Sequence, residues 1–459
     1  MKKYFGDRKF YKMVLAVAIP IVVQFGISNF VNMLDNIMVG QLGTEQMTGV
    51  SVVNQLMFVF NLALFGAISG PGIFTAQYAG QKNDEGVRHT MRFKLILSVL
   101  ISVIGIVIFV LFKESLIMLF LHDNNSGIDL VKSLVSAKDY MFVMLFGLVP
   151  FALTCSYAGT LRETGETNLP MIAGVIAILV NLVFNYILIF GHFGAPKLGV
   201  VGAAIATVLS RYVELLIVVI WTHTHKTRAA YGVGLYKSFY IPAALISKMI
   251  VMGTPLFFNE FLWSMGMSSL TQCYSMRGLD VVAAFNISNT IVNLFNVVLI
   301  SMGNVVSIII GQQLGAGDME QVVDTDRKLI MMGVLASAFM GIVLIAAAPL
   351  FPKFYETTDD IRKLSVELMR IAAIFMPVGS YLNCAYFTMR SGGKTVITFL
   401  FDSVYLWVLC FPIAFVISRF TDLPILPFYV IILSLDFVKV IIGTILLKKR
   451  IWIQNIVNQ

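Results

Sequence analysis

The sequence predicts an all-α membrane protein with twelve transmembrane helices in two pseudo-symmetric six-helix lobes. Of its 459 residues, 58% are hydrophobic and only 13% are charged, whereas soluble proteins carry about 25% charged residues. The apolar residues form long runs, and about 20 such residues cross a bilayer as a helix. Polar residues of the first half also recur in the second half. A soluble protein is therefore excluded.

Apolar runs between turn residues and charges place the spans in chain order. We expect them at 13–37, 50–73, 95–112, 137–158, 169–190, 199–222, 249–272, 281–307, 329–350, 365–388, 396–417 and 426–447. The first run follows basic residues, as in a signal peptide, but it is too long and lacks a cleavage site, so it is predicted to be retained. Basic residues concentrate in alternate loops, which predicts a multi-pass protein of the cell inner (plasma) membrane with both termini cytoplasmic.

An internal repeat predicts the domain organisation. A shift of 235 residues matches Pro20 with Pro255, Asn54 with Asn289, Gln77 with Gln312 and Gly80 with Gly315, and a shift of 228 matches Arg162 with Arg390 and Arg211 with Lys439. We expect lobes at 1–222 and 249–459, joined by a cytoplasmic linker at 223–248. Because six spans return the chain to its starting side, both lobes enter the bilayer in one direction, with a binding cavity between them. This favours a transporter over a structural bundle.

Three carboxylates in the predicted spans, Asp35, Glu260 and Asp402, have no basic residue within four positions. A charge at bilayer depth costs roughly 3 kcal/mol or more, so each needs a tertiary partner, a proton or a bound cation. Other acids have a basic residue three positions away, close enough for a local pair on a helix. We interpret as mainly structural the pairs Glu367 with Arg370, Arg211 with Glu214 and Asp436 with Lys439.

A cation site is predicted in the first lobe around Asp35. Asn181 and Asn185 share a helical face, and both lie about 8 to 14 Å from the outer end of their span, a depth that Thr207 and Asp35 can share. One carboxylate, two amides and a hydroxyl suit a hard cation or a proton. The alternatives are an interfacial carboxylate that reaches water and an asparagine pair that bonds helix to helix.

In the second lobe, Glu260 lies near the middle of its span, directly after Asn259 and among aromatic residues. Such a carboxylate suits proton exchange or a cationic substrate, and burial as a neutral acid is the alternative. Asp402 is in a similar position. We therefore predict Glu260, Asn259 and Asp402 as substrate or coupling residues.

Other chemistry is not predicted. The stretch 392–395 imitates a phosphate-binding loop, but the required first glycine is absent, so ATP is not expected as the energy source. The spans lack a histidine or Ser/Lys constellation, so we expect no enzyme, no catalytic residues and no cofactor. The basic excess of +8 indicates orientation rather than a nucleic-acid partner.

Together these residues resemble the multidrug and toxic compound extrusion (MATE) family over essentially the full length. The resemblance rests on Pro20, the stretch from Asp35 to Gly43, the stretch Ala76 to Gly80 and its repeat Gly311 to Gly317, Arg162 with Gly165, and Gly202 to Thr207. It implies two lobes that rock between inward-open and outward-open states. It also implies export of organic, often cationic, compounds in exchange for entering Na⁺ or H⁺.

The resemblance extends to single residues. Asp35 is similar to the family's acid in the first span, and Glu260 to the seventh-span acid of one branch. Asn181, Asn185 and Thr207 are similar to the family's other cation ligands in this lobe. If the protein is sodium-coupled, the four residues would bind Na⁺. The sequence departs from relatives that carry an acid in the tenth span or at Asn185, so the choice of Na⁺ or H⁺ stays open.

The expected partners are small organic cations or drugs and membrane lipid, and we expect a monomer. The alternative function is a flippase for lipid-linked sugars or another lipid-like substrate, which would favour a strongly basic cavity. Three carboxylates without a local partner favour cationic cargo instead.

Overall fold

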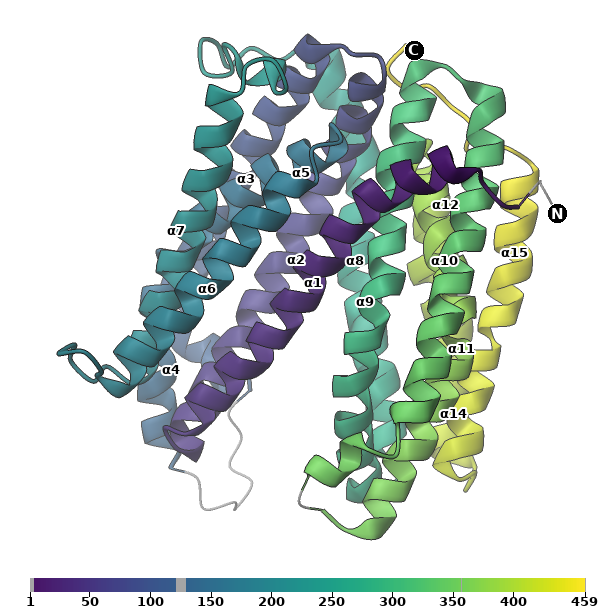
Figure 1. The fold of residues 1–459 in the computed structure, drawn as a ribbon. Coiled ribbons are helices and arrows are strands. Elements are labelled where there is room, and N and C mark those ends of the chain that lie inside the picture. The colour runs from purple at the N-terminus through teal and green to yellow at the C-terminus, as the bar shows by residue number, and fades with distance from the viewer. Residues whose placement is uncertain (1–3, 121–128, 356, 459) are drawn as a thin grey trace. The chain divides into compact units, whose positions relative to one another are not determined.

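The structure is a computed structural model that describes residues 4–120, 129–355 and 357–458, and its regular elements there are all helices (Figure 1). In this part of the chain, eleven helices are long and apolar enough to cross a membrane, and twelve if the bent pair of helices at 130–163 is one span. The predicted all-α membrane fold with twelve spans is confirmed.

The first half forms seven helices. Their bounds are α1 (Arg8–Gly40), α2 (Thr44–Gly80), α3 (Asp84–Met118), α4 (Leu130–Leu145), α5 (Leu148–Glu163), α6 (Asn168–Phe190) and α7 (Val200–Thr224). The fourth predicted span is not one straight helix, because α4 and α5 meet at a bend of 48°. Pro150 explains the break, since it has no N–H for the carbonyl four residues earlier.

The second half continues the pattern after a short connection. Its elements are η1 (Ala230–Gly232), α8 (Ala243–Ser275), α9 (Leu279–Ala316), α10 (Met319–Ala347), η2 (Phe351–Phe354), α11 (Asp359–Ser391), α12 (Thr395–Phe399), η3 (Leu400–Val404), η4 (Leu406–Cys410), α13 (Phe411–Phe420), α14 (Ile425–Ser434) and α15 (Asp436–Lys448). The eleventh predicted span is the rod from α12 to α13, in which η3 and η4 are π-helical. Short π segments recur at functional sites.

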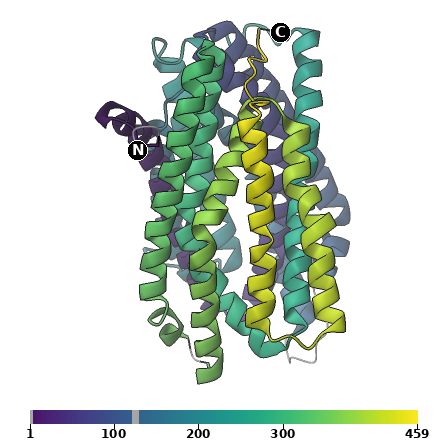
Figure 2. The same cartoon turned by 90° about the vertical axis from the view of Figure 1, so that its right-hand side faces the viewer.

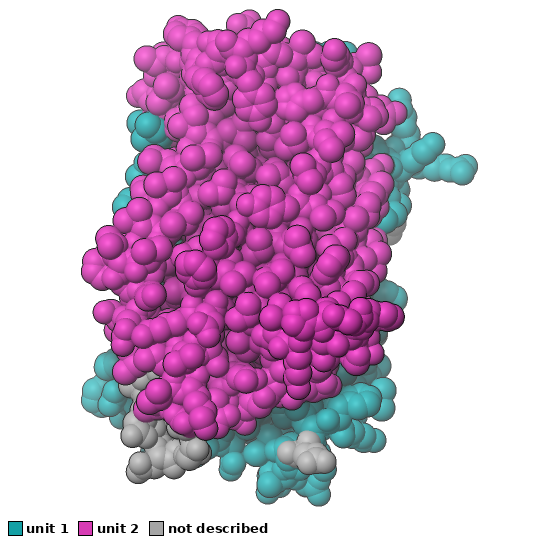
Figure 3. Space-filling model, turned by 90° about the vertical axis from the view of Figure 1, so that its left-hand side faces the viewer, with its two compact units in different colours: residues 1–22, 76–82, 250–459 teal, residues 23–75, 83–249 magenta. Residues whose placement is uncertain are grey.

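The chain forms two compact units, coloured separately in Figure 3. One unit holds residues 1–22, 76–82 and 250–459, and the other holds 23–75 and 83–249. The start of α1 and the last turn of α2 thus belong to the unit that the second half builds. The lobe boundaries expected at 222 and 249 stay a prediction.

Each unit has its own apolar core. In the unit of residues 23–75 and 83–249, α2, α4 and α7 contribute Val53, Ala137 and Ala204, all fully buried. In the other unit α9, α10 and α11 pack side by side, and α15 lies against α11 (Figures 1 and 2). Outward faces carry exposed apolar side chains such as Leu111 and Phe112 of α3, as surfaces in contact with lipid do.

Two helix ends cross at repeat-related glycines. A Cβ atom on Gly80 of α2 would lie 1.9 Å from the carbonyl oxygen of Gln312, and one on Gly315 of α9 would lie 1.9 Å from that of Gln77. Gln77 matches Gln312 in the sequence repeat, and Gly80 matches Gly315. Each glycine therefore faces the backbone of the glutamine from the other copy, and all four residues lie in one compact unit.

Candidate cation and substrate sites

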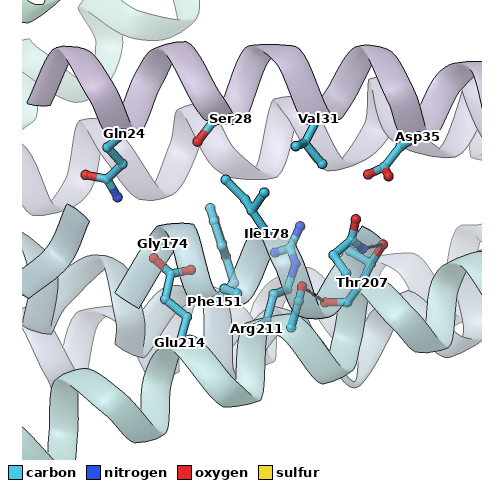
Figure 4. A pocket seen from close by; sticks show the side chains of 13 residues that line it. Gln24, Ser28, Val31, Asp35, Phe151, Gly174, Ile178, Thr207, Arg211 and Glu214 are labelled. Atoms are coloured by element: carbon cyan, nitrogen blue, oxygen red, sulfur yellow. Dashed lines mark hydrogen bonds between the residues drawn. The ribbon is translucent and has the colours of Figure 1, made fainter. Parts of the chain in front are cut away.

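A cavity of about 190 Å³ lies within the unit of residues 23–75 and 83–249, between α1, α5, α6 and α7 (Figure 4). Residues 24, 28, 31 and 35 of α1 line it, and this spacing places them on one helical face. The complete lining is Gln24, Ser28, Val31, Asp35, Phe151, Gly174, Ala177, Ile178, Asn181, Thr207, Ser210, Arg211 and Glu214. It is rich in polar side chains for a space inside an apolar bundle.

The structure brings all four residues of the predicted cation site together. Asn185 Nδ2 donates to Asp35 Oδ1 at 2.7 Å and lies 3.2 Å from the Asn181 amide. The other end of the Asn181 amide lies 3.2 Å from Thr207 Oγ1. Side chains of the three helices α1, α6 and α7 are thus linked in one polar network that includes the Asp35 carboxylate.

The Asn181 amide is satisfied when its nitrogen faces Asp35 and its oxygen faces Thr207. Its atom that faces Asp35 lies 3.0 and 2.9 Å from the two carboxylate oxygens. With the nitrogen there, the amide donates to both oxygens of Asp35 and accepts from the Thr207 hydroxyl. Asn185 Oδ1 is also buried and, among the described residues, has no hydrogen-bond partner. This donor set fits a small hard cation or a proton.

Small residues explain why α6 and α7 approach closely enough to form the cluster. A Cβ atom on Gly202 of α7 would lie 2.6 Å from the carbonyl oxygen of Leu188 on α6. Gly202 begins a run in which Ala203, Ala204 and Ala206 are also buried. Small side chains let membrane helices pack backbone to backbone. The asparagines of α6 can therefore reach Thr207.

Sequence reasoning missed part of this cavity. Arg211 and Glu214 were predicted to form a local pair, but in the described part of the chain they are not within ion-pair distance. The Arg211 guanidinium instead lies over the Phe151 ring, 4.3 Å from its centroid. Gln24 and Ser28 were not predicted at all. Their helical spacing from Asp35, at four and three residues per step, is the signal that places them on the same face.

The second predicted site is held by an ion pair that sequence spacing did not reveal. Lys439 Nζ donates to Asp402 Oδ1 at 2.7 Å, so Asp402 has a basic partner and the expected local pair of Lys439 with Asp436 is wrong. Asp436 begins α15, and only Leu435 separates it from the end of α14 at Ser434. The pairing therefore runs between spans rather than along one helix.

Asn259 joins the same network. Its Nδ2 donates to Asp402 Oδ2 at 3.2 Å and to the Tyr386 hydroxyl at 3.3 Å. The Ser403 hydroxyl donates to Asn259 Oδ1 at 2.8 Å. Asp402 and Ser403 both lie in the π-helical turn η3. The structure thus brings Asn259 and Asp402 together.

Glu260 is partly buried and is not part of that hydrogen-bond network. Its charge interacts with those of Arg390 and Asp402. The predicted local pair of Glu367 with Arg370 is present at 2.8 Å.

The predicted cation site of the first half is not repeated in the second. The shift of 235 puts Leu270 at the place of Asp35, and the shift of 228 puts Leu409, Ile413 and Leu435 at the places of Asn181, Asn185 and Thr207. All four are apolar. The two copies share a helical scaffold, but they carry different polar chemistry.

Comparison with known proteins agrees with this architecture. The MatE family model matches residues 20–187 and 255–416. A protein of Thermotoga maritima named probable multidrug resistance protein NorM is 26% identical over 421 residues, which cover 90% of this chain and 87% of the relative. A protein of Bacillus subtilis named probable multidrug resistance protein YoeA is 24% identical over 404 residues, with coverage of 85% and 82%.

A solved structure shows the shared fold. It is described as the outward-facing conformation of a multidrug resistance MATE family transporter of the MOP superfamily. It matches with a TM-score of 0.86 and 20% identity, covering 98% of this chain and 97% of the other. The family match spans most of the chain and falls in both halves of the repeat. This chain therefore belongs to the MATE family of multi-pass membrane transporters.

Proposed function

We propose that the protein exports small organic compounds, cations in particular, by antiport with Na⁺ or H⁺. The observation that carries this proposal is the convergence of Asp35, Asn181, Asn185 and Thr207 on one oxygen-rich point. The names of the relatives, probable multidrug resistance proteins, support small-molecule cargo. No catalytic step and no cofactor is part of the proposal.

Coupling is proposed to start at Asp35. A carboxylate inside a bilayer is costly unless a proton or a cation compensates its charge. In the ion-free state the Asn181 amide nitrogen donates to both oxygens of the carboxylate and compensates part of its charge. An ion drives a transporter only by binding one conformation more tightly than another. A difference in how α1, α6 and α7 converge supplies that preference.

Cargo contact is proposed for the second half. Lys439 neutralises Asp402, which leaves Glu260 as the carboxylate that offers its charge to an organic cation. Asn259 and Asp402 would then order the surface beside it. The proposal includes a monomer in the cell inner membrane, with both termini cytoplasmic and lobes at 1–222 and 249–459 joined by the linker 223–248.

A flippase for lipid-linked sugars is the second candidate, and no observation favours it. A pyrophosphate would need a strongly basic cavity. The described cavity contains two acids, Asp35 and Glu214, and one basic residue, Arg211. Its charges suit a cation rather than a phosphate.

Transport in proteoliposomes tests the function. With a fluorescent organic cation as cargo, we expect an inward Na⁺ gradient or an inward proton gradient, imposed separately, to drive export. Coupling through one carboxylate predicts that at least one of the two gradients suffices. If neither gradient moves the cargo against its concentration, the antiport proposal is wrong.

Replacing Glu260 with glutamine should lower export of cationic cargo more than export of neutral cargo. The amide keeps the shape of the side chain but removes the charge that attracts a cation. Export of matched cationic and neutral dyes from everted vesicles measures the difference. Glu320→Gln, an exposed acid at the start of α10, is the control. Equal losses for both dyes would contradict a role in cargo contact.

A further inference from the structure

The cavity beside Asp35 continues to a second carboxylate. Figure 4 shows Asp35 and Thr207 at one end, Gln24 and Glu214 at the other, and Arg211 between them. On α1 the step from Gln24 to Asp35 is eleven residues, or about 16 Å at 1.5 Å per residue. The cavity is therefore an elongated space inside one unit, with an acid at each end.

Glu214 forms no ion pair within the described residues, although two arginines lie near enough for their charges to interact with it. The charges of Arg162 and Arg211 both interact with it. Arg162, however, donates to Gln24 Oε1 at 2.8 Å, and Arg211 lies over Phe151. In the part of the chain that the structure describes, no basic group is within 4.0 Å of the Glu214 carboxylate. Its oxygens are thus free to face the cavity.

The space between the two acids can hold water. A volume of about 190 Å³ exceeds by far the 10 to 15 Å³, roughly, that one water molecule requires. Ser28 and Ser210 line the walls between the ends, and their hydroxyl oxygens can accept hydrogen bonds. Ser28 and Ser210 thus offer polar contacts to a small hydrated ion or a proton between the two ends.

We propose that Glu214 is a second, weaker station for the coupling cation, reached from Asp35 through this cavity. The proposal rests on the function proposed above and names the route by which the ion leaves. The ligand is a small monovalent cation, Na⁺ or H⁺. The two neighbouring guanidinium groups keep binding at Glu214 weak, which a release site requires, because an ion must leave each site as readily as it enters.

The direction of release follows from the predicted orientation. With the N-terminus cytoplasmic, Gln24 lies nearer the cytoplasm than Asp35 along α1. The Glu214 end is then the cytoplasmic end of the cavity. A cation bound at Asp35 from outside would pass Ser28 and Arg211 on its way inward.

Separate measurements of binding and exchange test the proposal. Equilibrium binding of Na⁺ and uptake of protons are measured on purified protein, and the decay of each imposed gradient in the presence of cargo is measured in proteoliposomes. We expect Glu214→Gln to bind the cation as the unmodified protein does and to exchange it about tenfold more slowly, a barrier higher by about 1.4 kcal/mol. Ser28→Leu, which fills the middle of the route, should act in the same way, and Glu214→Asp should restore exchange.

Two control variants carry the same chemical changes elsewhere. Glu114→Gln alters an exposed acid of α3 that pairs with Lys138 at the surface, and Ser51→Leu alters an exposed serine of α2. Both should exchange normally. Exchange at full speed in Glu214→Gln and Ser28→Leu overturns the route. Loss of cation binding in Glu214→Gln also overturns it, because Glu214 would then belong to the Asp35 site.

The result for Asp35→Asn separates this proposal from the function on which it rests. If Asp35→Asn loses cation binding and Glu214→Gln exchanges the cation at full speed, the proposed function stands and the second station at Glu214 is refuted. Unchanged binding in Asp35→Asn contradicts the proposed cation site, and with it the relay from Asp35, whatever Glu214→Gln does.

Discussion

Replacing Asp35 with asparagine is expected to abolish cation-driven export while cargo binding persists. The variant keeps the shape of the side chain and removes the carboxylate on which Asn181, Asn185 and Thr207 converge. Removing one partner of a buried charge pair costs about 3 to 5 kcal/mol. At about 1.4 kcal/mol per tenfold, 3 kcal/mol corresponds to cation binding weaker by roughly 100-fold. Export driven by either gradient should fall to the level of empty liposomes.

The pH dependence of binding identifies the carboxylate as the shared site. Because Na⁺ and H⁺ would compete for one charge, lowering the pH should weaken Na⁺ binding to the unmodified protein. Asp35→Asn should show neither Na⁺ binding nor this dependence. Titration of purified protein with Na⁺ at several pH values measures both. Unchanged Na⁺ affinity in Asp35→Asn would refute the assignment.

Asp129→Asn is the matched control for Asp35→Asn. Asp129 accepts hydrogen bonds from the backbone N–H groups of Val131 and Lys132 at the start of α4. Hydrogen bonds from these groups hold the pKa of its carboxyl below the usual value. Asparagine caps a helix about as well as aspartate. The control therefore makes the same chemical change and should leave cation binding and export intact.

Replacing Gly315 with alanine is expected to cause a large loss of stability for the addition of a single methyl group. Its Cβ atom would lie 1.9 Å from the carbonyl oxygen of Gln77, a backbone atom that no side-chain rotation can move. The ends of α2 and α9 would have to separate, and overpacking of this kind typically costs about 1 to 3 kcal/mol or more. Thermal unfolding of the purified protein in detergent should begin several degrees lower.

Gly26→Ala provides the comparison for Gly315→Ala. Gly26 lies inside α1, and its added Cβ atom would meet nothing within 4 Å. Alanine also favours the helix over glycine. Thermal stability should therefore stay the same or rise. An equal loss in both variants would mean that the close crossing of α2 and α9 does not limit stability.

The two halves of the repeat use acids in different ways. In the first half, neutral amides and a hydroxyl surround Asp35, so its charge remains available to an ion. In the second half, the Lys439 ammonium pairs with the Asp402 carboxylate, so an internal cation takes the place that an exchangeable ion could have. Lys439 matches Arg211 in the repeat, whose guanidinium lies over Phe151 and leaves Glu214 unpaired. The position of one basic side chain thus decides whether the nearby acid is free.

The sequence by itself determined the membrane fold, the repeat and which four residues form the polar network around Asp35. Hydropathy shows the spans because a helix in lipid must satisfy its backbone within itself. The depth of a residue in the bilayer can also be estimated from its position in the span, because a helix rises by a constant distance per residue. Asp35, Asn181, Asn185 and Thr207 could therefore be grouped before their contacts were seen.

Only the tertiary structure decided which charges meet. Asp402 and Lys439 are 37 residues apart and pair between spans, while Arg211 and Glu214, three residues apart on one helix, do not. Spacing along a helix brings two side chains near each other. Whether they pair depends on how each helix is rotated against its neighbours. It also depends on whether an aromatic ring holds the guanidinium elsewhere. Both conditions depend on packing between segments distant in the chain, which the local pattern does not encode.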